Sequence, residues 1–174
     1  MKHKLTAIIS VFLLLFTLTA CHKKTASEEF YENYQKVKVS DALFKSKTRG
    51  TTKKEAEKIF GKPASKDNSN KNMPAWTWKK DSVKLQIAFS ENEACLTELR
   101  GLKWDENKDI AKEYSKIDKG ASLSKVIDKC GKPNQINELY AMNNHMKVYR
   151  YKYKSHEYNF IFNEKNKLIN KTEK

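Results

Sequence analysis

The chain has 174 residues and a net charge of +14, from 35 lysine and arginine residues against 21 acidic ones. Only Arg49, Arg100 and Arg150 are arginines, so the forked contacts that read nucleic-acid bases are scarce and a nucleic-acid partner is disfavoured. The lysine excess instead favours diffuse attraction to polyanions such as wall polymers or anionic lipids, unless it reflects only AT-rich codon usage.

The first 21 residues have the layout of an export signal. Residues 1–4 are basic, residues 5–18 form an almost uncharged apolar run, and Leu-Thr-Ala leads into Cys21. The apolar run is shorter than the roughly 20 residues of a spanning helix. Leu-Thr-Ala-Cys resembles the bacterial lipobox, in which the cysteine receives a diacylglyceryl group and becomes the N-terminus. This implies a signal peptide over 1–20 and lipid attachment at Cys21, on the extracytoplasmic face of a cell membrane, with a Gram-positive source favoured. The alternative is an ordinary signal peptide with a chance cysteine.

Residues 21–38 are expected to be a tether between the lipid and the folded domain. The stretch is polar at first and then contains Phe30, Tyr31, Tyr34 and Val37. These four residues either form a docking helical turn or lie loose, and the sequence leaves both possibilities open.

The remainder of the chain contains an internal repeat in two ungapped blocks. Residues 44–63 match residues 114–133: each begins with an aromatic residue, has a glycine six positions on, and closes with Gly-Lys-Pro. Residues 76–97 then match residues 149–170 in an alternating apolar pattern. Two matched blocks in the same order indicate two copies of one unit, repeat 1 over 39–104 and repeat 2 over 105–174.

Each copy is predicted to contain two short helices. Thr52-Lys-Lys-Glu55 is a capping box that begins a helix ending at Phe60, before Gly61. The second copy repeats this helix from an N-cap at Ser122 to Cys130. A preceding helix is expected near 39–47 in the first copy and near 108–117 in the second.

The second part of each copy is predicted to form antiparallel strands. Val83, Leu85, Ile87 and Phe89 alternate with more polar residues, which is typical of a strand with one buried face. Hairpin turns are expected at 90–93 and 163–166. The sequence therefore predicts an α+β fold of two tandem repeats, each with a helix pair on one face of an antiparallel sheet. Because each copy is small, the two are expected to pack together.

This arrangement resembles the tandem-repeat superfamily of the secreted β-lactamase inhibitor protein (BLIP-like), and within it an uncharacterised lipoprotein domain of Gram-positive bacteria. The small outer-membrane-assembly lipoproteins are a distant single-copy relative. The resemblance covers 39–174 and rests on the Gly…Gly-Lys-Pro spacing followed by an aromatic and an apolar strand. It implies a binding role on an exposed sheet face. The inhibitor's target-inserting loop acid cannot be matched residue by residue to this chain, so β-lactamase inhibition is not carried over.

A partner-binding patch is predicted from five aromatic residues on two matched strands. They are Trp76, Trp78, Tyr149, Tyr151 and Tyr153. On the sheet face opposite the helices they would be interface anchors, whereas on the helix-covered face they would be core residues. The sequence allows both.

The cysteines and histidines are expected to be structural. Cys130 aligns with Phe60 and Cys95 with Leu168, so both are interpreted as small core residues, although a disulfide between them is permitted in an exported protein. His145 and His156 lack metal-ligand spacing, and His156 aligns with a strand valine. No metal, cofactor or membrane-spanning segment is expected beyond the lipid anchor.

No motif for catalysis is present in the sequence. There is no nucleophile elbow or phosphate loop, and the matched acids Glu91 and Glu164 fall in predicted turns. We therefore expect a non-catalytic binding protein that engages a protein partner through an open sheet face. The alternatives are a basic envelope protein that binds a wall polymer or anionic lipid, and an inhibitor of an envelope or secreted enzyme.

Overall fold

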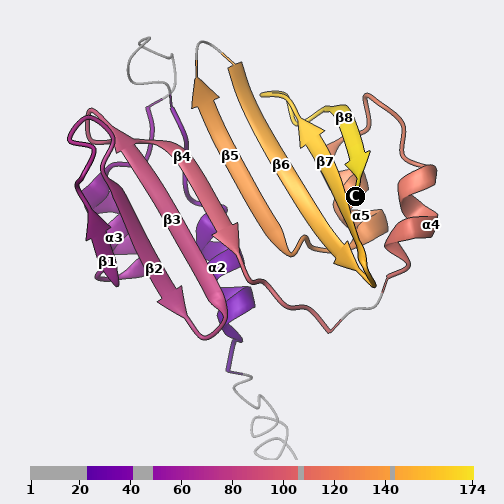
Figure 1. Cartoon of the computed structure of the whole chain (residues 1–174), viewed down its shortest axis with the longest axis horizontal. Helices are drawn as coiled ribbons and strands as arrows, with labels where there is room; N and C mark the ends of the chain where they lie inside the picture. The colour runs from indigo at the N-terminus through magenta and orange to yellow at the C-terminus, as the bar shows by residue number, and fades with distance from the viewer. Residues whose placement is uncertain (1–22, 41–48, 106–107, 142–143) are drawn as a thin grey trace, which may run out of the picture.

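The computed structural model describes residues 23–40, 49–105, 108–141 and 144–174. They form an α+β fold with one antiparallel sheet, whose eight strands lie side by side in their order along the chain (Figure 1). The helices lie on one side of the sheet, behind the strands in the view of Figure 1. The predicted α+β class with an antiparallel sheet is therefore confirmed. None of the helices in this part of the chain is both long and apolar enough to span a bilayer.

The sheet is continuous across the middle of the chain. Its first four strands are β1 (Ser65–Asp67), β2 (Ala75–Lys80), β3 (Val83–Ser90) and β4 (Glu93–Arg100). The other four are β5 (Gln135–Ala141), β6 (Asn144–Tyr153), β7 (His156–Phe162) and β8 (Leu168–Glu173). The described helices are α2 (Ala26–Tyr34), α3 (Lys53–Phe60), α4 (Ile110–Ser115) and α5 (Leu123–Cys130). Strand β4 pairs with β5, from Leu96 opposite Leu139 to Arg100 opposite Gln135.

Helices α3 and α5 begin and end at the residues that the sequence predicts. Thr52 accepts a hydrogen bond from the backbone N–H of Glu55, whose carboxylate accepts one from the Thr52 N–H at 2.8 Å. Ser122 caps α5 in the same way, by accepting from the Lys125 N–H. Each helix ends at a glycine with positive φ, 77° in Gly61 and 79° in Gly131. Local capping signals thus set both helices.

The helix predicted to come first in each copy is described only in part. Helix α4 lies inside the predicted range 108–117. Most of the helix predicted for 39–47 falls outside the described residues, and Val39 and Ser40, which are described, are not helical.

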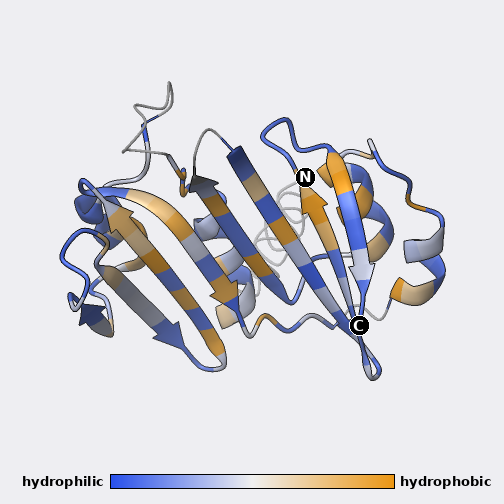
Figure 2. Cartoon of the chain, turned by 45° about the horizontal axis from the view of Figure 1, so that its top comes forward, coloured by the Kyte–Doolittle hydropathy of each residue, from blue (hydrophilic) through white to orange (hydrophobic). Residues whose placement is uncertain are grey.

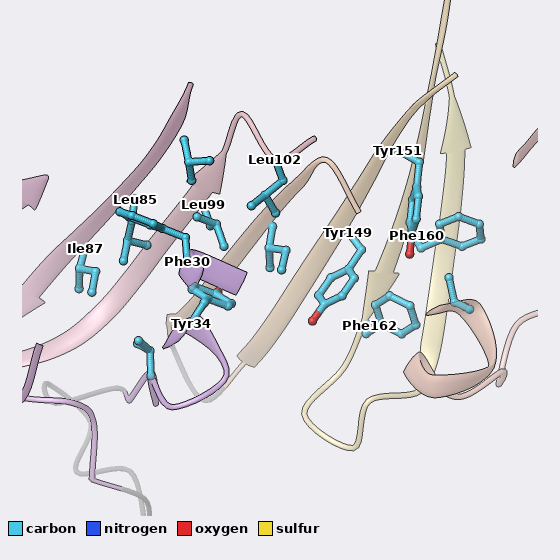
Figure 3. Close-up of a cluster of buried hydrophobic side chains, with 14 of the residues drawn as sticks. Phe30, Tyr34, Leu85, Ile87, Leu99, Leu102, Tyr149, Tyr151, Phe160 and Phe162 are labelled. Carbon is cyan, nitrogen blue, oxygen red and sulfur yellow. The ribbon is translucent and has the colours of Figure 1, made fainter. Parts of the chain in front are cut away.

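Residues 26–34 dock as a helix, which is one of the two alternatives that the sequence leaves open for this part of 21–38. They form helix α2, which Thr25 and Glu28 begin with a capping box. Phe30 and Tyr34 are 6% and 4% exposed and lie against the sheet (Figure 3). The helix is therefore part of the hydrophobic core, because its apolar face has the spacing of successive helical turns.

Helix α2 also joins the two halves of the sheet through a buried polar contact. The Tyr34 hydroxyl lies 2.7 Å from the Thr97 hydroxyl on β4 and donates to the Glu138 carboxylate on β5 at 3.2 Å. Near the other end of the helix, Ser27 accepts a hydrogen bond from the Lys103 N–H at 2.8 Å. The helix thus bridges the seam where β4 meets β5.

The two halves contain the same contacts at matched positions. Trp78 Nε1 donates to the carbonyl of Gly61 at 2.8 Å, and the Tyr151 hydroxyl donates to the carbonyl of Gly131 at 3.0 Å. The first bond joins β2 to the C-terminal end of α3, and the second joins β6 to the C-terminal end of α5. Each half also has a register shift at the same point, at 88/89 between β3 and β4 and at 161/162 between β7 and β8.

Candidate functional site

The five aromatic residues predicted to form a partner-binding patch do not lie on the uncovered face. Trp76, Trp78, Tyr149 and Tyr151 are at most 8% exposed and belong to the hydrophobic core. Tyr153 is partly buried and packs against the same core. The prediction that these rings lie on the open face of the sheet is therefore wrong, because the helices cover them.

Strand register explains why the rings face the helices. Trp76 lies opposite Ile87, and Trp78 lies opposite Leu85, across β2 and β3. Tyr149 lies opposite Phe160 across β6 and β7, and Figure 3 shows this pair among the core side chains. Directly paired residues share one face of a sheet. Since the β3 side chains are core residues, the rings opposite them are core residues too.

The uncovered face carries exposed apolar side chains at one end. Leu96, Leu139 and Met146 lie opposite one another across β4, β5 and β6. Val148 and Ile161 are paired on β6 and β7 and are half-buried. Leu139 is 36% exposed and Met146 is 40% exposed. We call these five residues the apolar patch. Figure 2 shows apolar and polar bands alternating along the strands.

The other end of the same face is basic. Lys79, Lys84, Arg100 and Arg150 lie in register across β2, β3, β4 and β6, with Gln135 of β5 between the two arginines. We call the four cations the basic row. It lies four strand positions from the row containing Leu96 and Leu139, or about 13 Å along the strands.

On β4 and β5, polar side chains lie between the Leu96 and Leu139 row and the basic row, whereas on β6 Val148 of the apolar patch is next to Arg150 on the same face. Gln135 Nε2 donates to Glu98 Oε1 at 3.0 Å and to Asn137 Oδ1 at 2.9 Å. The uncovered face thus changes from apolar to basic along the strands.

The helix-covered face carries a polar group at the seam. Glu138 is 7% exposed, and its carboxylate lies 2.6 Å from His145 Nε2 and 3.4 Å from Lys147 Nζ. Burial raises the pKa of the adjacent Tyr34 hydroxyl well above its usual range, and the nearby Glu138 charge adds to this effect. Tyr34 therefore stays protonated and donates its hydrogen bond to Glu138.

The two described cysteines are thiols and are not joined by a disulfide. Cys130 lies in the core, where burial raises the pKa of its thiol to about 11. It is therefore a poor nucleophile at neutral pH. Cys95 is buried outside that cluster, with Sγ 3.4 Å from the Ala88 carbonyl. Phe89 pairs with Ala94, and the matched Phe162 pairs with Leu168 across a connection one residue longer, so Ala94, not Cys95, is the counterpart of Leu168, which corrects the predicted alignment.

The histidines and the turn acids are dispersed. His145 contacts Glu138, and the exposed His156 lies 3.3 Å from Glu173. Glu91 and Glu164 are exposed in separate turns. In the described part of the chain, no three His, Cys, Asp or Glu side chains are placed to hold one metal ion. The position of Cys21 lies outside the described residues.

Comparison with solved structures shows the fold. The structure is similar to the crystal structure of a "putative beta-lactamase inhibitor protein" from Streptococcus mutans, with a TM-score of 0.69 and 21% identity. That match covers 87% of this chain and 98% of the other. The expected resemblance to the β-lactamase-inhibitor-protein fold is thus supported at the level of the fold.

Two further structures match more weakly. An extracellular SCP-domain protein from Bacillus anthracis has a TM-score of 0.31 and 12% identity, over 79% of this chain and 48% of that one. A DUF4309 family protein from Bacillus subtilis has a TM-score of 0.28 and 12% identity, over 84% of this chain and 93% of that one.

Comparison with protein families gives the clearest assignment. No curated protein matches the chain. The family described as a domain of unknown function with solved structure, DUF3862, matches residues 26–174. Its match begins at the first residue of α2, in agreement with the inclusion of that helix in the core. The chain belongs to the DUF3862 family.

Proposed function

We propose that the chain is a non-catalytic binding protein, anchored outside the cytoplasm by a lipid on Cys21, that captures a protein partner on the apolar patch. The observation that carries the proposal is the exposure of Leu139 and Met146 on a sheet face that no described helix covers. Exposed apolar side chains that lie together favour a protein partner, because a polyanion has no apolar surface to cover them. The net charge of +14 favours an acidic partner and speeds encounter with it.

The tandem-repeat organisation is part of this proposal. It is supported by the matched aromatic bonds from Trp78 to Gly61 and from Tyr151 to Gly131. It is also supported by two isolated bridges at matched positions, Thr52 with Glu93 and Ser122 with Lys167. Duplication of a helix-on-sheet unit would give the wide sheet face that a partner needs.

The lipid anchor has its own test. Cells grown with labelled palmitate are expected to incorporate the label into the wild-type protein and not into the Cys21→Ala variant. Fractionation should then release the variant from the membrane. Equal labelling of both proteins, or none of either, would contradict anchoring at Cys21.

The partner-binding role is tested by photocrosslinking on intact cells. A photoreactive residue at position 139 is expected to crosslink one defined protein. The Met146→Asp substitution should weaken its capture at least tenfold, since a carboxylate would be buried in an apolar interface. The matched control is Met73→Asp, because Met73 is 43% exposed but lies before β2, outside the apolar patch.

The salt dependence of capture distinguishes protein binding from the rival function, polyanion binding. Protein capture through the apolar patch should persist when the salt concentration is raised. A crosslinked wall polymer whose binding collapses between low and moderate salt would instead identify a polyanion-binding protein. Equal loss of capture in both aspartate variants would exclude the apolar patch as the contact.

Enzyme inhibition is a second candidate function, favoured by the fold similarity to the Streptococcus mutans protein. Its test is the hydrolysis rate of β-lactamases and envelope hydrolases with and without the purified chain. We expect no loss of rate with β-lactamase, since no residue of this sequence can be matched to the inhibitor's loop acid.

A further inference from the structure

A basic pocket opens where the seam between β4 and β5 ends. The pocket has a volume of about 490 Å³ and lies beyond the last paired residues of these strands, Arg100 and Gln135. Four cations contribute to its lining, with no acidic residue among the lining side chains. The cations are Arg100, Lys103, Arg150 and Lys152.

The four cations of this pocket form no ion pair within the described residues. None of the four cations has a carboxylate within 4 Å in the part of the chain that the structure describes. Placing like charges around one pocket is unfavourable unless an anion joins them. Two of the four are arginines, whose planar donors suit the oxygens of a phosphate group.

The pocket is held in shape by its backbone contacts. Asn134 donates to the Leu102 carbonyl at 3.2 Å and accepts from the Lys152 N–H at 2.7 Å. Ser82 donates to the Gly101 carbonyl at 3.1 Å. Gly101 has a φ of 80°, and a Cβ atom there would lie 2.0 Å from the Ser82 carbonyl oxygen. Only glycine therefore permits this close approach of the two loops.

The pocket lies at the end of the molecule from which the N-terminal segment leaves. Lys103, which lines the pocket, is bound through its N–H to Ser27 in the first turn of α2. In Figure 1 the segment before α2 leaves at the bottom, beside the β2–β3 turn and the end of β4. Ser82 and Lys103 also line a neighbouring pocket that includes Thr25.

The start of α2 limits how far this end can lie from a lipid on Cys21. Cys21 and Ala26 are five positions apart, so even a fully extended chain spans at most about 18 Å between them. The helix capping box fixes Thr25 and Ala26 to the folded domain. A lipid at Cys21 would therefore hold the basic end of the sheet close to the headgroups, with Leu139 and Met146 of the apolar patch at the far end.

We infer that the pocket formed by Arg100, Lys103, Arg150 and Lys152 binds the phosphate of an anionic phospholipid headgroup in the membrane that carries the anchor. This inference rests on the proposed lipid anchor for its orientation. The lipid chains at Cys21 attach the protein to the membrane, and the pocket fixes the orientation of the sheet relative to the bilayer. Leu139 and Met146 of the apolar patch then lie at the end of the sheet remote from the bilayer, where a partner can reach them.

The three arginines allow a direct test by NMR. The full protein is produced in its own cells with ¹⁵N-labelled arginine, extracted in neutral detergent, and titrated with dihexanoyl-phosphatidylglycerol. The Nε–H signals of Arg100 and Arg150 are expected to shift and saturate, while that of Arg49 stays fixed. Dihexanoyl-phosphatidylcholine at the same concentration should cause no saturating shift, since its choline cation opposes binding among four cations.

Substitutions show whether the pocket itself is responsible. The combined Arg100→Gln and Arg150→Gln variant should bind phosphatidylglycerol at least tenfold more weakly than wild type. Arg49→Gln is the matched control, because it removes a cation that pairs with Glu55 outside the pocket. Unchanged thermal unfolding of these variants verifies that the fold is intact.

Three outcomes would overturn the inference. Equal shifts of all three arginine signals would show diffuse charge attraction. Equal affinity for inorganic phosphate and phosphatidylglycerol would show a site for free anions, and no saturating shift would show no site. The mass of the N-terminal peptide from the same sample reports lipidation separately. An unmodified Cys21 with intact lipid binding would contradict only the anchor.

Discussion

A chain that begins at Val39 is expected to lose cooperative folding, whereas one that begins at Lys24 keeps it. The longer chain retains helix α2 and the residues that follow it, in which Phe30, Tyr34 and Val37 are at most 9% exposed. Burial of three such side chains contributes on the order of 5 kcal/mol or more. That is comparable with the whole free energy of unfolding of a domain this size. The measurement is urea unfolding followed by circular dichroism and tryptophan fluorescence.

The polar bridge of α2 adds to this loss. Without Tyr34, the buried Glu138 carboxylate and Thr97 hydroxyl lose a hydrogen-bond partner at the seam of the sheet. Tyr34→Phe serves as the graded control and should cost about 1–3 kcal/mol. Equal unfolding midpoints for the chains beginning at Lys24 and Val39 would show that residues 26–38 are a tether after all.

The sequence contains a signal for α2 that the tether interpretation overlooked. Thr25-Ala-Ser-Glu28 is a capping box of the same type as Thr52-Lys-Lys-Glu55, which was interpreted correctly. Ala26, Phe30 and Tyr34 follow at four-residue spacing. The polar start of the stretch favoured a tether and left its aromatic residues undecided, but tertiary packing stabilises short helices that would be marginal alone.

Local signals predicted the matched helices well, because capping and glycine termination act within a few residues. Gly61 and Gly131 end their helices as expected. Which face of the sheet the aromatic side chains occupy depends instead on how the strands pair. The turn at Asp81 and Ser82 fixes which β3 residue lies opposite Trp78, and this register indicates a core position.

The basic pocket could not be predicted from local patterns. Arg100 and Arg150 are distant in sequence and meet only because β4, β5 and β6 pair in one register. The apolar patch has the same origin, since Leu96, Leu139 and Met146 come from three strands. Long-range strand pairing determines both features, and the sequence alone leaves that pairing open.

Trp78→Ala is expected to destabilise the fold by about 3–5 kcal/mol, as is typical when a large buried aromatic residue is truncated. Trp78 is 2% exposed and its ring lies 5.7 Å from that of Phe60, at the end of α3. Its Nε1 atom donates to the carbonyl of Gly61, so the substitution removes both a packing partner and a hydrogen bond at the helix end. The measurement is the urea unfolding midpoint of the purified chain.

Two neighbouring changes separate packing from surface effects. Trp78→Phe keeps most of the ring volume but leaves the Gly61 carbonyl without its donor, so a smaller loss of about 1–2 kcal/mol is expected. Lys79→Ala removes an exposed side chain of the basic row from the opposite face and should change stability by less than about 0.5 kcal/mol. If Trp78→Ala instead unfolded at the wild-type midpoint while partner capture was lost, the ring would be an interface anchor. The register with Leu85 argues against that result, because an anchor would have to share a face with the core of the sheet.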